Sequence, residues 1–241
     1  MNAEVEGHLP ERLFALINAA WTTRAIAVAA ELRIAEALQA GPRSEVDLAA
    51  ACDAHPASLR RLLRALCAIG LFEERTDGRY ALLPVGALLA HDHPQSLRSW
   101  ALQFGRQLWP AWGELDVSVR SGKGLRQRQG ELHGFAHLDR DAEAAAVFHN
   151  AMVEITRLVA DDAVGQVDDL GHAQTIVDVG GGHGRLLTAF LHRWPGASGT
   201  VLDWRMRRAA PPPTWPNRGS AAVRSSRPVT SSKRCRPPTC C

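Results

Sequence analysis

The stretch that decides the fold covers residues 175–203 and reads TIVDVGGGHGRLLTAFLHRWPGASGTVLD. Its first five residues, TIVDV, are mostly β-branched and predict a strand. The next five, GGGHG, form a glycine-rich loop, and residues 185–194 then follow a helical pattern that Pro195 and Gly196 end. Residues 199–203 predict a second strand that closes on Asp203. Strand, glycine loop, helix and strand in this order make half of a nucleotide-binding α/β fold.

The spacing of the glycines indicates which kind of nucleotide would bind. A dinucleotide fingerprint requires G-x-G-x-x-G, whereas the glycines here stand at 180, 182 and 184 and are preceded by Asp178, which gives D-x-G-x-G-x-G. Glycines let the backbone turn sharply and let a ligand approach closely. A carboxylate at Asp203 can accept both hydroxyl hydrogens of a ribose. The pattern therefore favours a nucleoside without a pyrophosphate, such as S-adenosylmethionine.

Residues 1–95 predict a helical module with a β-hairpin. Residues 11–38 form one long helical pattern with apolar side chains on more than one face, so this helix is either internal or part of a subunit contact. A capping pattern at Ser44 and an apolar rhythm over residues 59–69 predict two further helices. Residues 76–78, Thr-Asp-Gly, predict a hairpin turn. This order of elements is that of a winged helix.

A winged helix raises the possibility of DNA binding. Arg60, Arg61 and Arg64 lie on the helix that would read the bases. Residues 41–90, however, hold six basic and six acidic side chains, so the positive surface expected of a DNA-binding domain is absent. The sequence favours protein contacts for this module, and a winged-helix DNA-binding regulator is the alternative.

Residues 96–170 are predicted to be mainly helical. Large apolar side chains crowd residues 96–112, three of them tryptophans, and either core packing or an aromatic-lined pocket would use them. Residues 121–124 mark a loop, and residues 141–164 form a further helical pattern. On that helix Met152 shares an apolar face with Phe148, and spacing alone favours core packing over a substrate wall.

Composition excludes several classes of protein. Apolar residues make up 46% of the 241 residues and charged residues 22%, which is enough to build a core. The longest apolar run, residues 81–90, is too short for a membrane span, and Glu4 and Glu6 do not fit a secretory signal. The five cysteines show neither a disulfide framework nor a metal-binding spacing. We expect a cytoplasmic protein with no metal and no membrane partner.

The charge of the chain is unevenly distributed. Residues 204–241 hold nine basic residues and no acidic one, which leaves nineteen basic against twenty-five acidic residues before them. This segment shows neither helical nor strand periodicity. A shifted reading frame explains its composition best, and a disordered tail or a basic arm for nucleic acids or membrane surfaces are the alternatives. In each case we expect a tail without a folded core.

Two of these motifs resemble those of a known family. Residues 177–184, VDVGGGHG, and residues 199–203, GTVLD, are similar to the cofactor motifs of bacterial S-adenosylmethionine-dependent O-methyltransferases that act on aromatic polyketides and phenazines. Plant phenolic and hydroxyindole O-methyltransferases are more distant members. The resemblance extends over residues 10–203 and includes SVRSGK at 118–123 and FHNAM at 148–152. It implies an α+β N-terminal winged-helix dimerisation module followed by the start of an α/β Rossmann-like methyltransferase domain.

The resemblance also implies roles for particular residues. S-adenosylmethionine would be the cofactor, the methyl acceptor would be a small aromatic molecule, and the protein would be a homodimer. The residues that would bind the cofactor are Asp178, Gly180, Gly182 and Asp203, with the glycines against its methionine part. The residues that would lie near the acceptor are Phe148, Asn150 and Met152. The chain would then consist of a dimerisation module (1–95), substrate-side helices (96–170), part of the cofactor domain (171–203) and the basic tail (204–241).

The chain departs from the family pattern after Asp203. Members of the family continue with an acidic-aromatic motif near the adenine and with a histidine that acts as general base. Residues 204–241 match neither, and all ten histidines precede Asp203. His183 is interpreted as a filler of the loop, and no catalytic residue is assigned. We therefore expect a methyltransferase homologue that is inactive and poorly folded beyond residue 170. A dimerising interaction protein is the rival, and the residues leave open both the acceptor and whether oxygen or nitrogen receives the methyl group.

Overall fold

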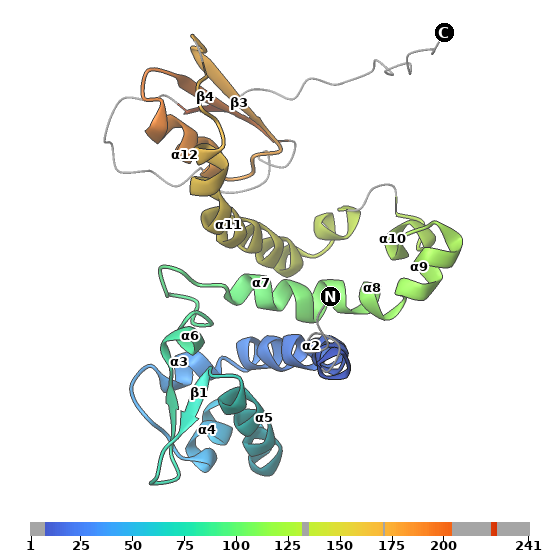
Figure 1. Ribbon diagram of the computed structural model, residues 1–241, viewed down its shortest axis with the longest axis vertical. Coiled ribbons are helices and arrows are strands. Elements are labelled where there is room, and N and C mark those ends of the chain that lie inside the picture. The colour runs from blue at the N-terminus through green and yellow to red at the C-terminus, as the bar shows by residue number, and fades with distance from the viewer. Residues whose placement is uncertain (1–7, 132–134, 171, 204–222, 226–241) are drawn as a thin grey trace. The chain divides into compact units, whose positions relative to one another are not determined.

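The computed structural model describes residues 8–131, 135–170, 172–203 and 223–225 (Figure 1). The chain forms two compact units, Met1–Ile155 and Thr156–Cys241. The division falls inside the helix α11 (Ala142–Gly165). The finer division of the chain at residues 95, 170 and 203 stays a prediction.

The first unit begins with the predicted winged helix, coloured blue to green-blue in Figure 1. Its helices are α2 (Leu9–Glu31), α3 (Ile34–Leu38), α4 (Glu45–Ala51), α5 (Pro56–Ala68) and the short α6 (Pro84–Ala87). The antiparallel strands β1 (Phe72–Glu74) and β2 (Tyr80–Leu82) form the hairpin between α5 and α6. Ser44 caps α4, as predicted, because its hydroxyl oxygen accepts the N–H of Asp47 at 3.2 Å.

The prediction of a single helix over residues 11–38 is wrong in one respect: the helix is not continuous, because Arg33 interrupts it. Arg33 has φ of +56°, in the left-handed region, and the chain turns there from α2 into α3. The turn directs Ile34 and Leu38, which are 0% and 3% exposed, into the core. Burying two such side chains contributes about 1.5–3 kcal/mol each, which exceeds the cost of one left-handed residue, about 1–2 kcal/mol.

The two halves of α2 have different surroundings. Ala27, Ala29 and Ala30 in its second half are at most 1% exposed, and the second half packs on the core formed by α3–α5 and the hairpin. Large apolar side chains in its first half are exposed: Leu13 by 59%, Phe14 by 69%, Ile17 by 62% and Trp21 by 73%. Among the described residues α2 is long and apolar enough to cross a membrane by length and composition, although no unbroken apolar run of that length is present in it. Core helices of soluble proteins pass the same test.

A second long helical stretch contains a π-helical turn. It runs from α7 (Arg98–Leu102) through η1 (Gln103–Leu108) to α8 (Trp109–Gly113). Pro110 explains the wide turn, because proline has no N–H to donate to a carbonyl one turn earlier. The guanidinium group of Arg24 in α2 donates to the carbonyl of Gly105 at 2.9 Å. A main-chain carbonyl in the wide turn of η1 thus receives its hydrogen bond from a side chain of α2.

The rest of the first unit is helical. It comprises α9 (Leu115–Ser121), α10 (Leu125–Arg128), the 3-10 turn η2 (Ala136–Asp139) and the first part of α11. Glu154 of α11 is 7% exposed, and its carboxylate accepts the N–H groups of Ser99 at 3.0 Å and Trp100 at 2.8 Å. These N–H groups belong to the first turn of α7 and have no partner within the helix. Glu154 therefore fixes the start of α7 on α11.

The second unit contains the predicted strand, loop, helix and strand. They are β3 (Thr175–Val179), α12 (Arg185–Arg193) and β4 (Ser198–Leu202), and the two strands pair in parallel. Leu187 and Leu191 of α12 pack on Val201 of β4 and on Ile176 of β3. On β3, Val177 and Val179 are 53% and 75% exposed. The helix thus covers one side of these strands.

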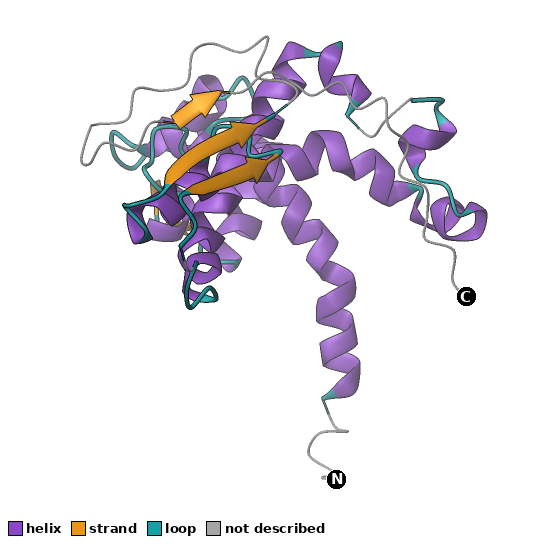
Figure 2. Cartoon of the chain, turned by 90° about the horizontal axis from the view of Figure 1, so that it is seen from above, coloured by secondary structure: helices purple, strands orange, loops and turns teal. Residues whose placement is uncertain are grey.

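A third strand, β5 (Val223–Ser225), extends this sheet. It pairs in parallel with β4, which gives the order β3-β4-β5, and Figure 2 shows the strands side by side. This strand lies in the segment predicted to be a tail without a folded core, so that prediction is wrong for residues 223–225. Main-chain hydrogen bonds to a strand edge require no particular side-chain pattern, which is why periodicity did not reveal it. Residues 204–222 and 226–241 lie outside the described residues.

Candidate functional site

The glycine loop and Asp203 meet at the carboxyl ends of β3 and β4. The register pairs Val179 with Leu202, so the residues that follow both strands lie at the same edge of the sheet. The N–H of Gly180 donates to the carbonyl of Leu202 at 2.7 Å. The N–H of Gly182 donates to Oδ2 of Asp203 at 2.9 Å. In open α/β sheets ligands bind at this edge of the strands.

The conformation of the loop explains why glycines are needed. Gly180 and Gly182 have φ of +78° and +51°, values that residues with a Cβ rarely adopt. Gly181 has no such φ, but a Cβ there would lie 2.3 Å from Oδ2 of Asp178. Gly181 is not among the residues that the sequence motif assigns to the cofactor. The sequence feature that could have revealed a role for Gly181 is Asp178, three positions earlier. Spacing alone, however, does not show that the Asp178 carboxylate lies under the loop.

Asp178 is the electrostatically unusual residue of the site. Its Oδ2 is buried and has no hydrogen-bond partner among the described residues. Burial raises the pKa of the Asp178 carboxyl, the backbone N–H of Leu187 opposes the rise, and the nearby charge of Asp203 adds to it. A buried acceptor without a partner is uncommon in proteins. It suits a ligand that brings a donor such as an ammonium or hydroxyl group, and a nucleoside with an amino-acid tail carries both.

The three residues predicted near the acceptor lie on α11 but do not share one face. The ring of Phe148 packs on that of Phe135, with 5.4 Å between their centroids. Met152 is four residues on, on the same face, and is 36% exposed, so the interpretation of this side chain as core packing is wrong. Asn150 is exposed and lies about 200° around the helix from Phe148. The role of these residues stays a prediction.

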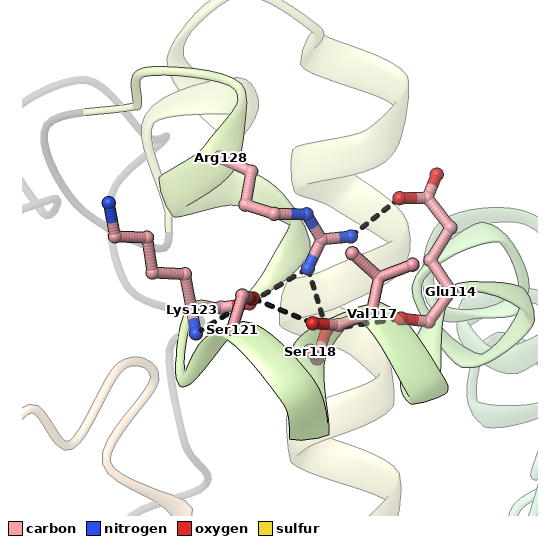
Figure 3. A network of polar contacts seen from close by, with 6 residues as sticks. All are labelled: Glu114, Val117, Ser118, Ser121, Lys123 and Arg128. Carbon is pink, nitrogen blue, oxygen red and sulfur yellow. Dashed lines mark hydrogen bonds and ion pairs between the residues drawn. The ribbon is translucent and has the colours of Figure 1, made fainter.

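The turn at residues 118–123 is held by its own polar contacts (Figure 3). Arg128 donates to the hydroxyl oxygen of Ser118 and to the carbonyl of Lys123, both at 2.8 Å. The same guanidinium group pairs with Glu114 at 2.5 Å. A planar guanidinium can serve several acceptors at once, and here it connects α9, the turn and α10. This motif therefore has a structural use within the first unit.

The arginines on the would-be DNA-reading helix are exposed, and one of them is paired with an acid. Arg60 on α5 forms an ion pair with Glu45 on α4 at 3.5 Å. Arg61 and Arg64 are exposed on the same helix. An even balance of charges and an internal ion pair agree with protein contacts as the use of this module.

Comparison with known proteins agrees with a module for protein contacts followed by a cofactor-binding domain. A model of the O-methyltransferase dimerisation domain matches residues 14–92, and a model of the O-methyltransferase domain matches residues 112–213. The phenazine O-methyltransferase PhzM of Lysobacter antibioticus is 33% identical over 191 residues, which are 79% of this chain and 56% of that protein. The 3-amino-4-hydroxybenzoate 4-O-methyltransferase of Streptomyces cremeus is 35% identical over 196 residues, 80% of this chain and 52% of that protein.

Solved structures show the same fold. The O-methyltransferase NcsB1 from neocarzinostatin biosynthesis, in complex with S-adenosylmethionine and 2-hydroxy-5-methyl naphthoic acid, aligns with a TM-score of 0.63 and 34% identity. The alignment covers 76% of this chain and 57% of that structure. The chain spans about half the length of the curated relatives it matches. With both domain models matched in the expected order, the chain belongs to the S-adenosylmethionine-dependent O-methyltransferase family.

Proposed function

We propose that this chain binds S-adenosylmethionine and takes part in the transfer of its methyl group to a hydroxyl of a small aromatic molecule. This departs from the expectation of an inactive chain that is poorly folded beyond residue 170, because β3, α12 and β4 form there and the two strands pair. The observation that carries the proposal is the 2.9 Å hydrogen bond between the N–H of Gly182 and the carboxylate of Asp203. It brings a ligand-accessible glycine loop and a strand-terminal acid into one site. Asp178, Gly180, Gly182 and Asp203 are the residues that would hold the cofactor.

Each of these residues has a distinct task in the proposal. When bound, the cofactor supplies a methyl group activated by a sulfonium. Asp203 would accept the ribose hydroxyls, and the loop from Gly180 to Gly182 would lie against the amino-acid part, with Asp178 beneath it. The loop positions the reactive group by its fixed backbone, and such positioning is a main source of rate in a bimolecular transfer.

The aromatic acceptor is proposed to contact Phe148, Asn150 and Met152. Phe148 and Met152 offer apolar surface for a ring, and Asn150 offers an amide that can donate or accept a hydrogen bond. The naphthoic acid in the NcsB1 structure and the phenazine and benzoate in the names of the relatives support an aromatic acceptor. A phenol must lose its proton during transfer, and the proposal assigns no residue of this chain as the base.

The proposal includes a homodimer in the cytoplasm. The exposed apolar side chains in the first half of α2 would be covered by a second copy of the chain. The match of residues 14–92 to a dimerisation domain supports this arrangement.

Isothermal titration of the purified chain with S-adenosylmethionine tests the proposal. We expect binding in the micromolar range and at least tenfold weaker binding by Asp203→Asn, because asparagine has one acceptor oxygen and no charge where the carboxylate has two acceptor oxygens and a negative charge. The exposed-site control Asp168→Asn should bind as wild type does. A wild-type chain that dimerises but binds no S-adenosylmethionine would contradict the proposal and support the rival interaction protein.

A further inference from the structure

The side-chain carbonyl of an amide in η1 is buried without a partner within the part of the chain that the structure describes. Gln103 is 5% exposed, and its Oε1 is buried without a hydrogen-bond partner. Leaving a buried acceptor unpaired costs stability, and native proteins retain such groups where they serve another purpose. π-helical turns like the one that begins at Gln103 are themselves frequent at functional sites.

The direction of Gln103 follows from its neighbours in η1. Gly105 faces α2, because a Cβ at Gly105 would lie 2.4 Å from the Cβ of Ala27. Residues two positions apart lie on nearly opposite sides of a helix, about 200° apart in the α form. Gln103 and Gln107 therefore both point away from α2. Gln107 confirms this, since its Nε2 donates to the carbonyl of Ala144 in α11 at 3.0 Å.

The contacts of α7 and η1 with α11 define an antiparallel register. Ser99 contacts Glu154 near one end, at 3.0 Å. Gln107 contacts Ala144 near the other end. Gln103 lies midway between these two anchors, so it falls opposite residues 147–151 of α11. All of these residues belong to the first unit, Met1–Ile155.

We propose that Gln103 determines which aromatic acceptor the protein prefers. This assignment rests on the proposed function. It places the amide opposite residues 147–151 of α11, a stretch that includes Phe148 of the proposed acceptor site. Its Oε1 can only accept a hydrogen bond, so the ligand must carry an N–H or O–H donor. The substrate class is an aromatic ring that carries an amino or hydroxyl group in addition to the hydroxyl that receives the methyl group.

Two probes that differ by one donor group test the assignment on the full chain. They are 3-amino-4-hydroxybenzoate and 4-hydroxybenzoate, and their dissociation constants are measured by calorimetry for wild type, Gln103→Met and the exposed control Gln127→Met. We expect wild type and the control to bind the amino compound about threefold to tenfold more tightly, the value of one neutral hydrogen bond. Gln103→Met, which keeps the length of the side chain but has no strong acceptor, should bind both compounds equally.

The midpoint of thermal unfolding is a second measurement. Substitution of a residue with a purely structural role would lower this midpoint. Because Gln103→Met removes an unpaired buried acceptor, its midpoint should be equal to or above that of wild type. A lower midpoint, a preference retained by Gln103→Met, or no preference in wild type would each overturn the assignment. Titration of the same samples with S-adenosylmethionine separates the two proposals. A wild-type chain that binds S-adenosylmethionine without distinguishing the probes overturns only the role of Gln103, whereas one that does not bind it overturns both.

Discussion

Gly181 has an unstrained backbone, yet alanine would not fit there, because the space of a Cβ is taken by the carboxylate of Asp178. Gly180 and Gly182, on either side, are needed for their positive φ. Neighbouring glycines in one loop thus have different physical reasons. An added Cβ at any of these three positions would therefore disturb the loop that contacts Asp203.

We expect Gly181→Ala to weaken S-adenosylmethionine binding at least tenfold and to destabilise the fold by about 1–3 kcal/mol, the usual cost of overpacking. Gly196→Ala is the matched control, since nothing lies within 4 Å of a Cβ at Gly196, and its stability should stay within about 0.5 kcal/mol of wild type. Calorimetry and urea unfolding measure the two effects. Tight binding by Gly181→Ala would contradict the placement of Asp178 under the loop.

The raised pKa of Asp178 predicts a pH-dependent effect of Asp178→Asn. A carboxyl with a raised pKa in the folded state disfavours its charged form there, so its ionisation lowers stability as pH rises from the unfolded value, about 3.9, through the folded one. Asparagine has no such penalty and can still accept the N–H of Leu187. We expect the variant to unfold at a higher temperature than wild type at pH 7 and at the same temperature below pH 4. A variant less stable at pH 7 would show that the carboxylate is needed in charged form.

At the scale of elements, contacts between helices decide how η1 is built. Pro110 opens the turn, Arg24 satisfies the carbonyl of Gly105, and the missing Cβ at Gly105 lets α2 approach. Glu154 then fixes the start of α7. The π-helical turn therefore has a local cause, Pro110, and is held in place by the packing of α2 on η1.

Gly105→Ala should destabilise the first unit by about 1–3 kcal/mol, because the added methyl group would overlap with Ala27. The same substitution at Gly113 in α8, where nothing lies within 4 Å of the added Cβ, should be neutral or stabilise by up to about 1 kcal/mol through helix propensity. Urea unfolding followed by tryptophan fluorescence compares the two. Equal stabilities would contradict the close approach of α2 and η1.

At the scale of the whole molecule, the first half of α2 exposes several large apolar side chains on one helix, and a grouping of this kind marks an interaction surface. Phe14 and Trp21 are the most exposed of these side chains, and aromatic residues of this kind often contribute most of the energy of an interface. This surface belongs to the domain that matches the dimerisation model. A subunit contact is the interpretation that accounts for both observations.

Trp21→Lys should convert a dimer into a monomer of 26.2 kDa in light scattering at micromolar concentration, because losing a central aromatic contact costs about 2 kcal/mol or more. Val119→Lys on α9, an equally exposed apolar position at 76%, is the control and should leave the mass unchanged. A wild-type chain that is already monomeric would contradict the proposed homodimer.

The sequence by itself determined β3, the glycine loop, α12 and β4, the cap at Ser44 and the hairpin turn, because each depends on patterns within a few neighbouring residues. The resemblance of its motifs also assigned the loop glycines and the acid at the end of β4 to one cofactor site, which is possible because parallel strands joined by a helix place their carboxyl ends together. Only the tertiary structure decided the turn at Arg33, the close approach of α2 to η1, the strand β5 and the burial of Gln103. Those features depend on contacts between residues far apart in the chain, where packing and main-chain pairing outweigh local preference.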